Sequence, residues 1–199
     1  PALFHVLAMK GFFSPKLLTD YGRDGGLFGE HPPAPKYLAG IEAATGSLGH
    51  GLPIGTGLAL SAKKKKNNFS VFVVLSDGEC NEGTVWEAAM FASANKLDNL
   101  TVIIDFNTWQ ATGRSEEILS LSPLPEKWAA FGWEIKEING HSFTDLEKCL
   151  SSKVNEKPLA VIAHTVKGKG ISFMEDDNNW HYKIPTSEEV ELAKKELNI

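Results

Sequence analysis

The sequence predicts an α/β fold with a doubly wound, mainly parallel sheet that carries helices on both faces. Short apolar runs, rich in β-branched and aromatic residues, alternate along the chain with longer helix-compatible segments. Such alternation is typical of strand–helix–strand units, whose crossovers place the strands in parallel. The predicted strands are Phe69–Leu75, Leu100–Asp105, Trp133–Ile138 and Leu159–Thr165.

Helices are expected before, between and after these strands. The expected helices are Ala2–Phe12, Gly83–Lys96, Leu124–Phe131, Phe143–Val154 and a last one that begins at Ser187. The last helix has Glu188 and Glu189 in its first turn and Lys194 and Lys195 near its end, as the helix dipole favours. The stretch Ser14–Lys36 is dense in Gly and Pro and is expected to be mostly loop.

The segment Thr45–Lys63 is unusually rich in glycine and other small residues. Glycine has little helix propensity, so a helix here must be held by close packing or must let the backbone approach a ligand. A loop on the phosphate side of a ligand is the favoured interpretation, with the turn from Gly46 to Gly51 at its centre.

Length, charge and cysteine content exclude several classes of protein. With 199 residues, 42% of them hydrophobic, the chain 1–199 is expected to form a single domain, truncated at its N-terminus because it begins at Pro1 without Met. The net charge of −5 and the lack of a basic stripe argue against nucleic acid as a partner. No apolar run is long enough to span a membrane. Two cysteines form neither a disulfide framework nor a metal cluster, which favours a cytoplasmic location.

Two polar residues follow predicted neighbouring strands at the points where those strands end. Asp77 comes after Phe69–Leu75, and Asn107 comes after the second apolar run. A crossover helix between them makes the strands parallel, so both residues should reach the same edge of the sheet, where ligands bind in such folds.

Carboxylate and amide oxygens are hard ligands that suit Mg²⁺ or Ca²⁺ rather than zinc. Magnesium usually keeps few protein ligands and completes its shell with waters and phosphate oxygens, so a site of this kind implies a phosphorylated ligand. Gly78 would let the backbone approach that ligand closely. The alternative interpretation is that Asp77 and Gly78 form an ordinary turn and that Asn107 is a loop residue.

The residues from Ser76 to Gly113 resemble the thiamine diphosphate motif, in which a Gly-Asp-Gly triplet is followed further along by Asn. Within that superfamily the chain resembles the transketolase family. Supporting stretches extend the resemblance from Leu3 to about Ala193. They are Ala39–Gly51, Gly132–Ile135, Asn139–His141, Ala163–Gly170 and Trp180–His181.

The resemblance implies transfer of a two-carbon ketol unit from a ketose to an aldose, with thiamine diphosphate and Mg²⁺ (or Ca²⁺ or Mn²⁺) as cofactors. Asp77, Asn107 and the backbone carbonyl of Trp109 would hold the metal. The implied cofactor-binding residues are Gly46, Leu48, Gly49, His50, Ser76, Asp77, Gly78, Glu79, Glu82, Asn107 and Trp109.

Histidines account for the implied catalytic residues. His31 lies in a Gly-Glu-His-Pro sequence and resembles the family histidine that reaches the donor hydroxyls, while His181 matches a substrate-side histidine more loosely. A surface loop position is the alternative for His31. His50 stands where most relatives carry Gln. Glu82 resembles a residue that pairs with a carboxylate of a partner chain, and a surface glutamate at a helix start is its alternative.

Several departures from the family pattern imply a partner. Ser76 replaces the first Gly of the motif, and both the upstream Gly-His-Ala segment and a second α/β domain are outside this sequence. That second domain would bind the pyrimidine ring and supply its activating glutamate. We therefore expect sugar substrates and a C-terminal subunit or domain pair, in a dimer or heterotetramer. Alternatives are a regulatory paralogue without turnover, and a subunit of another thiamine diphosphate-dependent synthase or decarboxylase.

Overall fold

Four parallel strands form the central sheet. They are β1 (Val71–Ser76), β2 (Leu100–Phe106), β5 (Glu134–Asn139) and β6 (Leu159–His164), in the order β1-β2-β6-β5. The register pairs Ser76 with Asp105 and Phe106 with His164, so the carboxyl ends of three adjacent strands lie level with one another. Each strand predicted from the sequence is confirmed, with bounds that differ by a residue or two.

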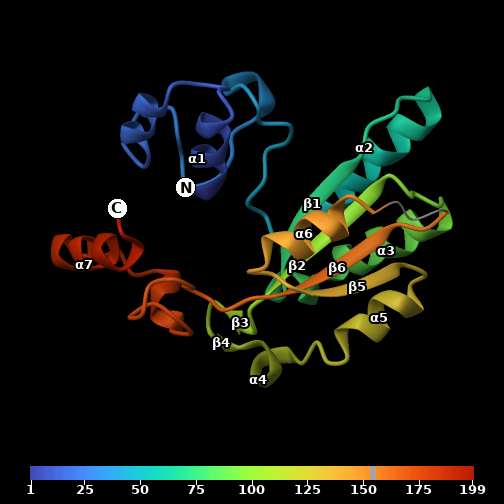
Figure 1. Cartoon of the computed structure of the whole chain (residues 1–199). Coiled ribbons are helices and arrows are strands. Elements are labelled where there is room, and N and C mark those ends of the chain that lie inside the picture. The colour runs from blue at the N-terminus through green and yellow to red at the C-terminus, as the bar shows by residue number, and fades with distance from the viewer. Residues whose placement is uncertain (153–155) are drawn as a thin grey trace. The chain divides into compact units, whose positions relative to one another are not determined.

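Helices cover both faces of this sheet in the computed structural model (Figure 1). The larger core lies between one face and the helices α2 (Gly51–Lys65), α3 (Gly83–Ala94) and α5 (Leu124–Ala130). A smaller core, around Cys149 and Val161, joins the other face to α6 (Phe143–Leu150). The predicted α/β class, with helices on both faces of a parallel sheet, is therefore confirmed.

The structure describes residues 1–152 and 156–199. They divide into two compact units, Pro1–His50 and Gly51–Ile199. The sheet and all the elements named above belong to the second unit. That residues 1–199 act as a single domain stays a prediction.

The first unit is built around a small aromatic and aliphatic core. Helix α1 (Ala2–Met9) contributes Phe4 and Leu7, which pack with Phe28 and the residues Leu38 and Ile41. The helix ends before the predicted Phe12, and Gly11 then adopts a positive φ of 81° that stops it from continuing. The expected loop stretch contains two short 3₁₀ helices, η1 (Pro15–Asp20) and η2 (Pro35–Tyr37).

Close packing explains one glycine of the glycine-rich segment. A Cβ added to Gly55 would lie 2.4 Å from Cγ2 of Val73, so α2 can approach β1 only without a side chain there. Gly57, on the same helix, has nothing within 4 Å of an added Cβ. Residues 45–50 are outside the helix, which begins at Gly51.

Several elements after β2 differ from the prediction. A hairpin of β3 (Trp109–Gln110) and β4 (Gly113–Arg114) leads into α4 (Ser115–Leu119), and none of the three was expected. Helix α6 ends at Leu150 rather than Val154, and residues 153–154 of that prediction lie outside the described residues.

The C-terminal part of the second unit follows β6. It contains the 3₁₀ helix η4 (Asn178–His181) and helix α7 (Ser187–Leu197). Thr186 and Glu189 form a capping box at the start of α7, which confirms the predicted helix start.

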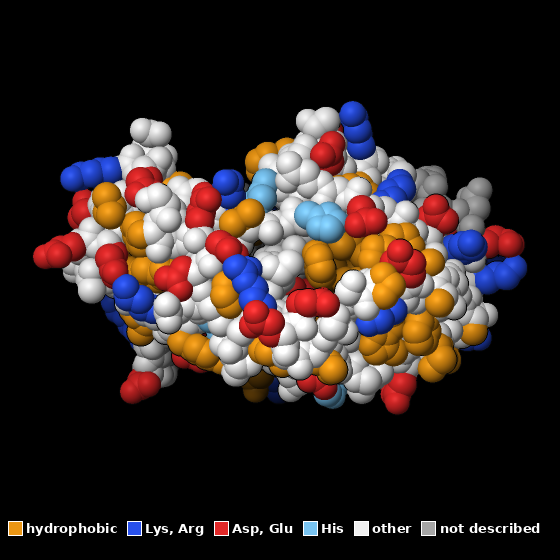
Figure 2. All heavy atoms as spheres, turned by 90° about the horizontal axis from the view of Figure 1, so that it is seen from below, with side chains coloured by type: hydrophobic (Ala, Val, Ile, Leu, Met, Phe, Trp, Pro, Cys, Tyr) orange, Lys and Arg blue, Asp and Glu red, His pale blue; other side chains and the backbone are white. Residues whose placement is uncertain are grey.

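Two findings concern the surface. Among the described residues, no helix combines the length and the apolar character needed to cross a membrane. Acidic and basic side chains are interspersed on the face seen in Figure 2, and the described residues form no continuous basic stripe there.

Candidate functional site

Asp77 lies at the carboxyl edge of the sheet, directly after β1, and its side chain has no exposed surface. Its Oδ1 accepts a hydrogen bond from the backbone N–H of Gly78 at 2.8 Å, and its Oδ2 accepts one from the hydroxyl of Ser115 at 3.0 Å. Burial raises the pKa of this carboxyl, and the hydrogen bonds from Ser115, Gly78 and the backbone of Thr108 oppose that rise. No lysine, arginine or histidine of residues 1–152 or 156–199 forms an ion pair with it. Asp77 is thus a buried acid without a cationic partner in the described chain.

The turn after β2 lies against this carboxyl. The Oδ1 of Asn107 accepts a hydrogen bond from the backbone N–H of Trp109 at 2.9 Å, which closes a tight turn around Thr108. Thr108 has a φ of 67°, a left-handed conformation that is unfavourable for a β-branched residue. Its carbonyl accepts a hydrogen bond from Ser115 at 2.9 Å, and its own N–H points to Asp77. The two strand ends predicted to meet are therefore connected through Thr108 and Ser115.

Gly78 and Gln110 form a close contact beside Asp77. A Cβ on Gly78 would lie 3.1 Å from Cγ of Gln110, so a side chain at position 78 would press against the hairpin. The Nε2 of Gln110 is buried and has no hydrogen-bond partner within the described ranges. A buried amide without an acceptor is costly, and a ligand oxygen at this place would satisfy it.

The short 3₁₀ helix η3 (Gly78–Asn81) leads from Asp77 to α3. The hydroxyl oxygen of Ser76 accepts a hydrogen bond from the backbone N–H of Glu79 at 3.0 Å, so the side chain that replaces a family glycine caps this turn. Glu79 is 9% exposed, whereas Glu82 is exposed at the start of α3. Cys80 is buried at the same turn, and burial raises the pKa of its thiol to about 12.

The hairpin is fastened to a later segment of the chain by Asp176. Trp109 Nε1 and Arg114 Nη1 donate hydrogen bonds to Asp176 Oδ1 at 2.7 and 2.8 Å. The guanidinium of Arg114 lies 3.7 Å from the ring centroid of Trp109. Arg114 and Asp176 therefore both contact the side chain of Trp109, the residue whose carbonyl was predicted to bind metal.

The remaining candidates belong to the first unit or to the C-terminal segment. His31 packs against Gly46, where an added Cβ would lie 2.7 Å from the imidazole Cδ2. Leu48 and His50 are exposed, and the His50 ring lies 3.1 Å, through Nδ1, from the Leu48 carbonyl oxygen. Gly49 has a φ of 83°. The structure therefore brings His31 and Gly46 together within the first unit.

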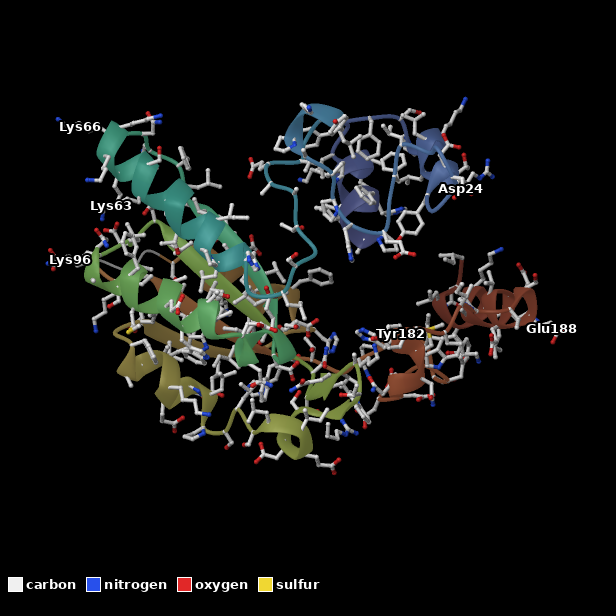
Figure 3. All side chains as sticks on the ribbon, turned by 180° about the vertical axis from the view of Figure 1, so that it is seen from behind. Asp24, Lys63, Lys66, Lys96, Tyr182 and Glu188 are labelled. Carbon is white, nitrogen blue, oxygen red and sulfur yellow. The ribbon has the colours of Figure 1, made fainter. Side chains whose placement is uncertain are left out.

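His181 is exposed at the end of η4, in the second unit. Its ring packs edge-on against that of Tyr182, with 4.6 Å between ring centroids. Tyr182 is labelled in Figure 3. The start of η4 is capped by Asp177, whose Oδ1 accepts a hydrogen bond from the backbone N–H of Asn179 at 2.9 Å. The segment thus presents His181 to solvent on a locally ordered turn.

The donor set at the sheet edge fits a hard divalent cation. It combines one buried carboxylate, one amide oxygen and the backbone oxygens of a tight turn, and a carboxylate retains lone pairs after accepting two hydrogen bonds. No group of three or more His, Cys, Asp or Glu suited to a metal was found among the described residues. A magnesium ion that takes most of its ligands from phosphate and water needs only one such residue.

Sequence reasoning missed Gln110, Arg114, Ser115 and Asp176. A signal existed for Ser115, because Ser-Glu-Glu after a Gly-containing turn indicates a helix start. Arg114 and Asp176 are distant in sequence and carry no such local signal.

A family model described as "Transketolase, thiamine diphosphate binding domain" matches residues 10–199. One of the subunits of the apulose-4-phosphate transketolase of Phocaeicola vulgatus is 42% identical over 199 residues, which cover 99% of this chain and 70% of that protein. The 6-deoxy-6-sulfo-D-fructose transketolase subunit SqwG of a Clostridium species is 37% identical over 199 residues, which cover 99% of this chain and 72% of that protein. The crystal structure of transketolase from Campylobacter jejuni superposes with a TM-score of 0.86 at 29% identity, over 92% of this chain and 30% of that one.

Proposed function

Because this chain belongs to the transketolase family as its thiamine diphosphate binding domain, we propose that it is the diphosphate- and magnesium-binding subunit of a two-component transketolase. The enzyme would transfer a two-carbon ketol unit from a ketose to an aldose. The observation that carries the proposal is the buried Asp77 carboxyl, which has no cation partner in the described chain and lies beside the turn of Asn107.

Asp77, Asn107 and the carbonyl of Trp109 would hold Mg²⁺, or Ca²⁺ or Mn²⁺ in its place. The metal would offset the charge that burial makes costly at Asp77, and it would draw the diphosphate to the carboxyl edge of the sheet. When bound, thiamine diphosphate would supply the carbon nucleophile that carries the ketol unit between sugars.

Residues around the metal ligands would shape the rest of the cofactor site. Gly78 keeps the backbone open, and the unpaired Nε2 of Gln110 would donate to a ligand oxygen. Ser76 already accepts a hydrogen bond from Glu79, and its hydroxyl hydrogen is free to donate to a phosphate oxygen. The replacement of glycine by Ser76 is therefore compatible with cofactor binding.

The first unit and the C-terminal segment would supply the remaining residues. Gly46, Leu48, Gly49 and His50 would contact the cofactor, with Glu79 and Glu82 from the turn before α3. His31 and His181 would face the sugar. Both are exposed, which leaves them accessible to a substrate.

A separate partner chain would provide the pyrimidine-binding domain and its activating glutamate, in a dimer or heterotetramer. Relatives of which this chain covers 70% and 72% are named transketolase subunits, which supports this division. Exposed apolar side chains on the second unit support it too: Phe72, Val74, Met90 and Phe91 are each 48% or more exposed. The names of these two relatives include a sugar phosphate and a sulfo sugar. Because both of those sugars are anionic, we propose a phosphorylated or otherwise anionic sugar as the substrate.

A cytoplasmic location is part of the proposal. Cys80 and Cys149 are both free and buried in the structure. Free thiols in a chain of this kind fit a reducing compartment.

Thermal unfolding with thiamine diphosphate and Mg²⁺ tests the function. A ligand that binds only the folded state stabilises it by about 2.7 kcal/mol at 100 times its Kd, so the melting temperature should rise when both are added. Asp77→Ala should abolish this rise in melting temperature. Asn107→Ala should reduce the rise without abolishing it, since that variant removes a neutral ligand rather than a charged one. Asp24→Ala removes an exposed carboxylate outside the proposed ligand set and serves as the control (Figure 3). An unchanged wild-type melting temperature at saturating ligand would refute the proposal.

A further inference from the structure

Asp176 gathers three donors from the hairpin that follows the proposed metal ligands. Trp109 Nε1 lies 2.7 Å from its Oδ1, Arg114 Nη1 lies 2.8 Å from the same oxygen, and Arg114 Nη2 lies 2.5 Å from Oδ2. The arginine therefore grips the carboxylate with two parallel hydrogen bonds, a geometry that fixes direction as well as distance. One carboxylate thus holds both strands of the hairpin.

Arg114 also reaches the turn itself. Its Nη1 donates to the hydroxyl of Thr108 at 3.1 Å, and its guanidinium stacks on the Trp109 ring at 3.7 Å. Thr108 has the unfavourable φ of 67° that the turn requires. A strained turn keeps its conformation only when surrounding contacts hold it, and Arg114 supplies several of these contacts.

A second tether joins the same two segments. The Nδ2 of Asn178 donates to the carbonyl of Ala111 at 3.1 Å, at the tip of the hairpin. Residues 176–178 therefore hold the hairpin at both its base and its tip.

The ion pair between Arg114 and Asp176 is expected to contribute little to folding stability. The side chains of Arg114 and Asp176 are 34% and 53% exposed, and exposed ion pairs contribute little to folding. The contacts instead converge on Thr108 and Trp109, next to Asn107. Their effect should therefore be on the conformation of that turn rather than on global stability.

We propose that Arg114 and Asp176 are positioning residues that hold the turn Asn107–Trp109 in its metal-binding conformation. The inference rests on the proposed function, which assigns that turn to Mg²⁺. Neither side chain touches the metal; Arg114 orders the turn, and Asp176 orders Arg114 and the Trp109 indole. Groups that orient ligands from outside the coordination shell commonly change metal affinity roughly 10- to 100-fold when removed.

The same contacts link the proposed metal turn to the segment that carries His181. Asp176 is followed directly by Asp177, whose side chain caps η4. Loss of the Asp176 contacts should therefore loosen the hairpin and the start of the His181 segment together. Hydrogen exchange reports this without any ligand, since the Ser115 amide donates to the Thr108 carbonyl.

The test compares Arg114→Ala, Asp176→Ala and the double variant with wild type in the full chain. Mg²⁺ is titrated at a fixed, saturating concentration of thiamine diphosphate, with tryptophan fluorescence as the readout, and the melting temperature is measured without ligand. Lys63→Ala is the matched control, because Lys63 forms an ion pair of similar exposure with Asp98 at the end of the unit opposite Tyr182 (Figure 3). Arg114→Lys keeps the charge but loses the two-pronged geometry.

We expect each alanine variant to weaken Mg²⁺ binding roughly 10-fold or more, with an unliganded melting temperature close to that of the control. The double variant should lose about as much as either single one, because the two side chains act as a unit. Arg114→Lys should fall between wild type and Arg114→Ala. The amide of Ser115 should exchange faster in Arg114→Ala than in Lys63→Ala.

The experiment distinguishes a failure of the positioning role from a failure of the proposed function. If wild type binds Mg²⁺ with the cofactor and both alanine variants bind it equally well, the positioning role is wrong and the proposed function stands. Losses of Mg²⁺ affinity that merely follow a lowered melting temperature would also overturn the positioning role, since they indicate a structural role alone. If wild type itself shows no Mg²⁺-dependent binding, the proposed function is wrong and this inference falls with it.

Discussion

The hydroxyl of Ser115 donates a hydrogen bond to Oδ2 of Asp77 at 3.0 Å, between two buried residues that are 38 positions apart. The contact connects the first residue of α4 to the end of β1, and the backbone N–H of Ser115 bonds the carbonyl of Thr108 as well. Ser115 therefore joins the two strand ends at the candidate site. It does so in a place from which water is excluded, where a hydrogen bond to a carboxylate matters most.

Replacement of Ser115 by alanine should lower stability at neutral pH. The variant leaves a buried carboxylate with one hydrogen bond fewer, and such bonds contribute about 1.5 to 3 kcal/mol. Urea unfolding of wild type and Ser115→Ala measures the difference. Ser120→Ala removes an exposed hydroxyl that accepts a hydrogen bond from Ser122, and should change stability far less. Equal effects of the two variants would contradict a special role for the contact with Asp77.

Two glycines of α2 should respond in opposite ways to alanine. At Gly55 the new methyl group would lie 2.4 Å from Val73, and overpacking of this kind typically costs about 1 to 3 kcal/mol. At Gly57 the methyl group meets nothing within 4 Å, and the better helix propensity of alanine should stabilise the chain by about 0.5 to 1 kcal/mol. Chemical denaturation of both variants measures the two shifts. A gain in stability for Gly55→Ala would show that α2 is not held against β1 as described.

The sequence was sufficient to predict the sheet because its strands carry a local signal. Short apolar, β-branched runs such as Leu100–Phe106 favour a buried strand over other secondary structure, because they alternate along the chain with longer helical patterns. The same logic placed Asp77 and Asn107 at one edge, since parallel neighbours end together. The ends of helices were less predictable. Helix α1, for example, stops at Met9 because of a local turn that includes Gly11.

The hairpin at the candidate site escaped prediction for a physical reason. Strands as short as Trp109–Gln110 carry no periodic pattern, and their conformation depends on Arg114 and Asp176, which are 62 positions apart. Contacts of this range leave no trace in local propensity. The orphaned amide of Gln110 likewise became visible only when the packing around Gly78 was known.

Neither cysteine should react with a thiol reagent while the chain is folded. Burial raises the pKa of Cys80 to about 12, and burial also raises that of Cys149, although Lys136 opposes the second rise. Because only the thiolate is reactive, almost none is available at pH 8. Absorbance with a disulfide reagent should report two thiols in urea and a negligible rate in buffer. Cys149→Ser assigns any residual native reactivity, and fast labelling of that variant would show that the turn of Cys80 opens.

The ion pair between Lys63 and Asp98 should give a pH-dependent part of the stability. The hydrogen bond from Lys63 holds the pKa of Asp98 below its ordinary value, so the unfolded chain binds more protons than the folded chain at acidic pH. Its contribution is thus complete above the ordinary aspartate pKa and is lost as the pH falls through the lower, folded value. Exposed pairs of this kind contribute about 0.2 to 1 kcal/mol.

Stability curves of wild type and Lys63→Ala, measured from neutral to strongly acidic pH, should therefore converge in that acidic window. Lys64→Ala, on the same turn of α2, removes one positive charge without removing the contact to Asp98. Its difference from wild type should not share the same convergence. If both variants follow one pH profile, the effect comes from net charge, and the specific pairing of Lys63 with Asp98 contributes nothing measurable.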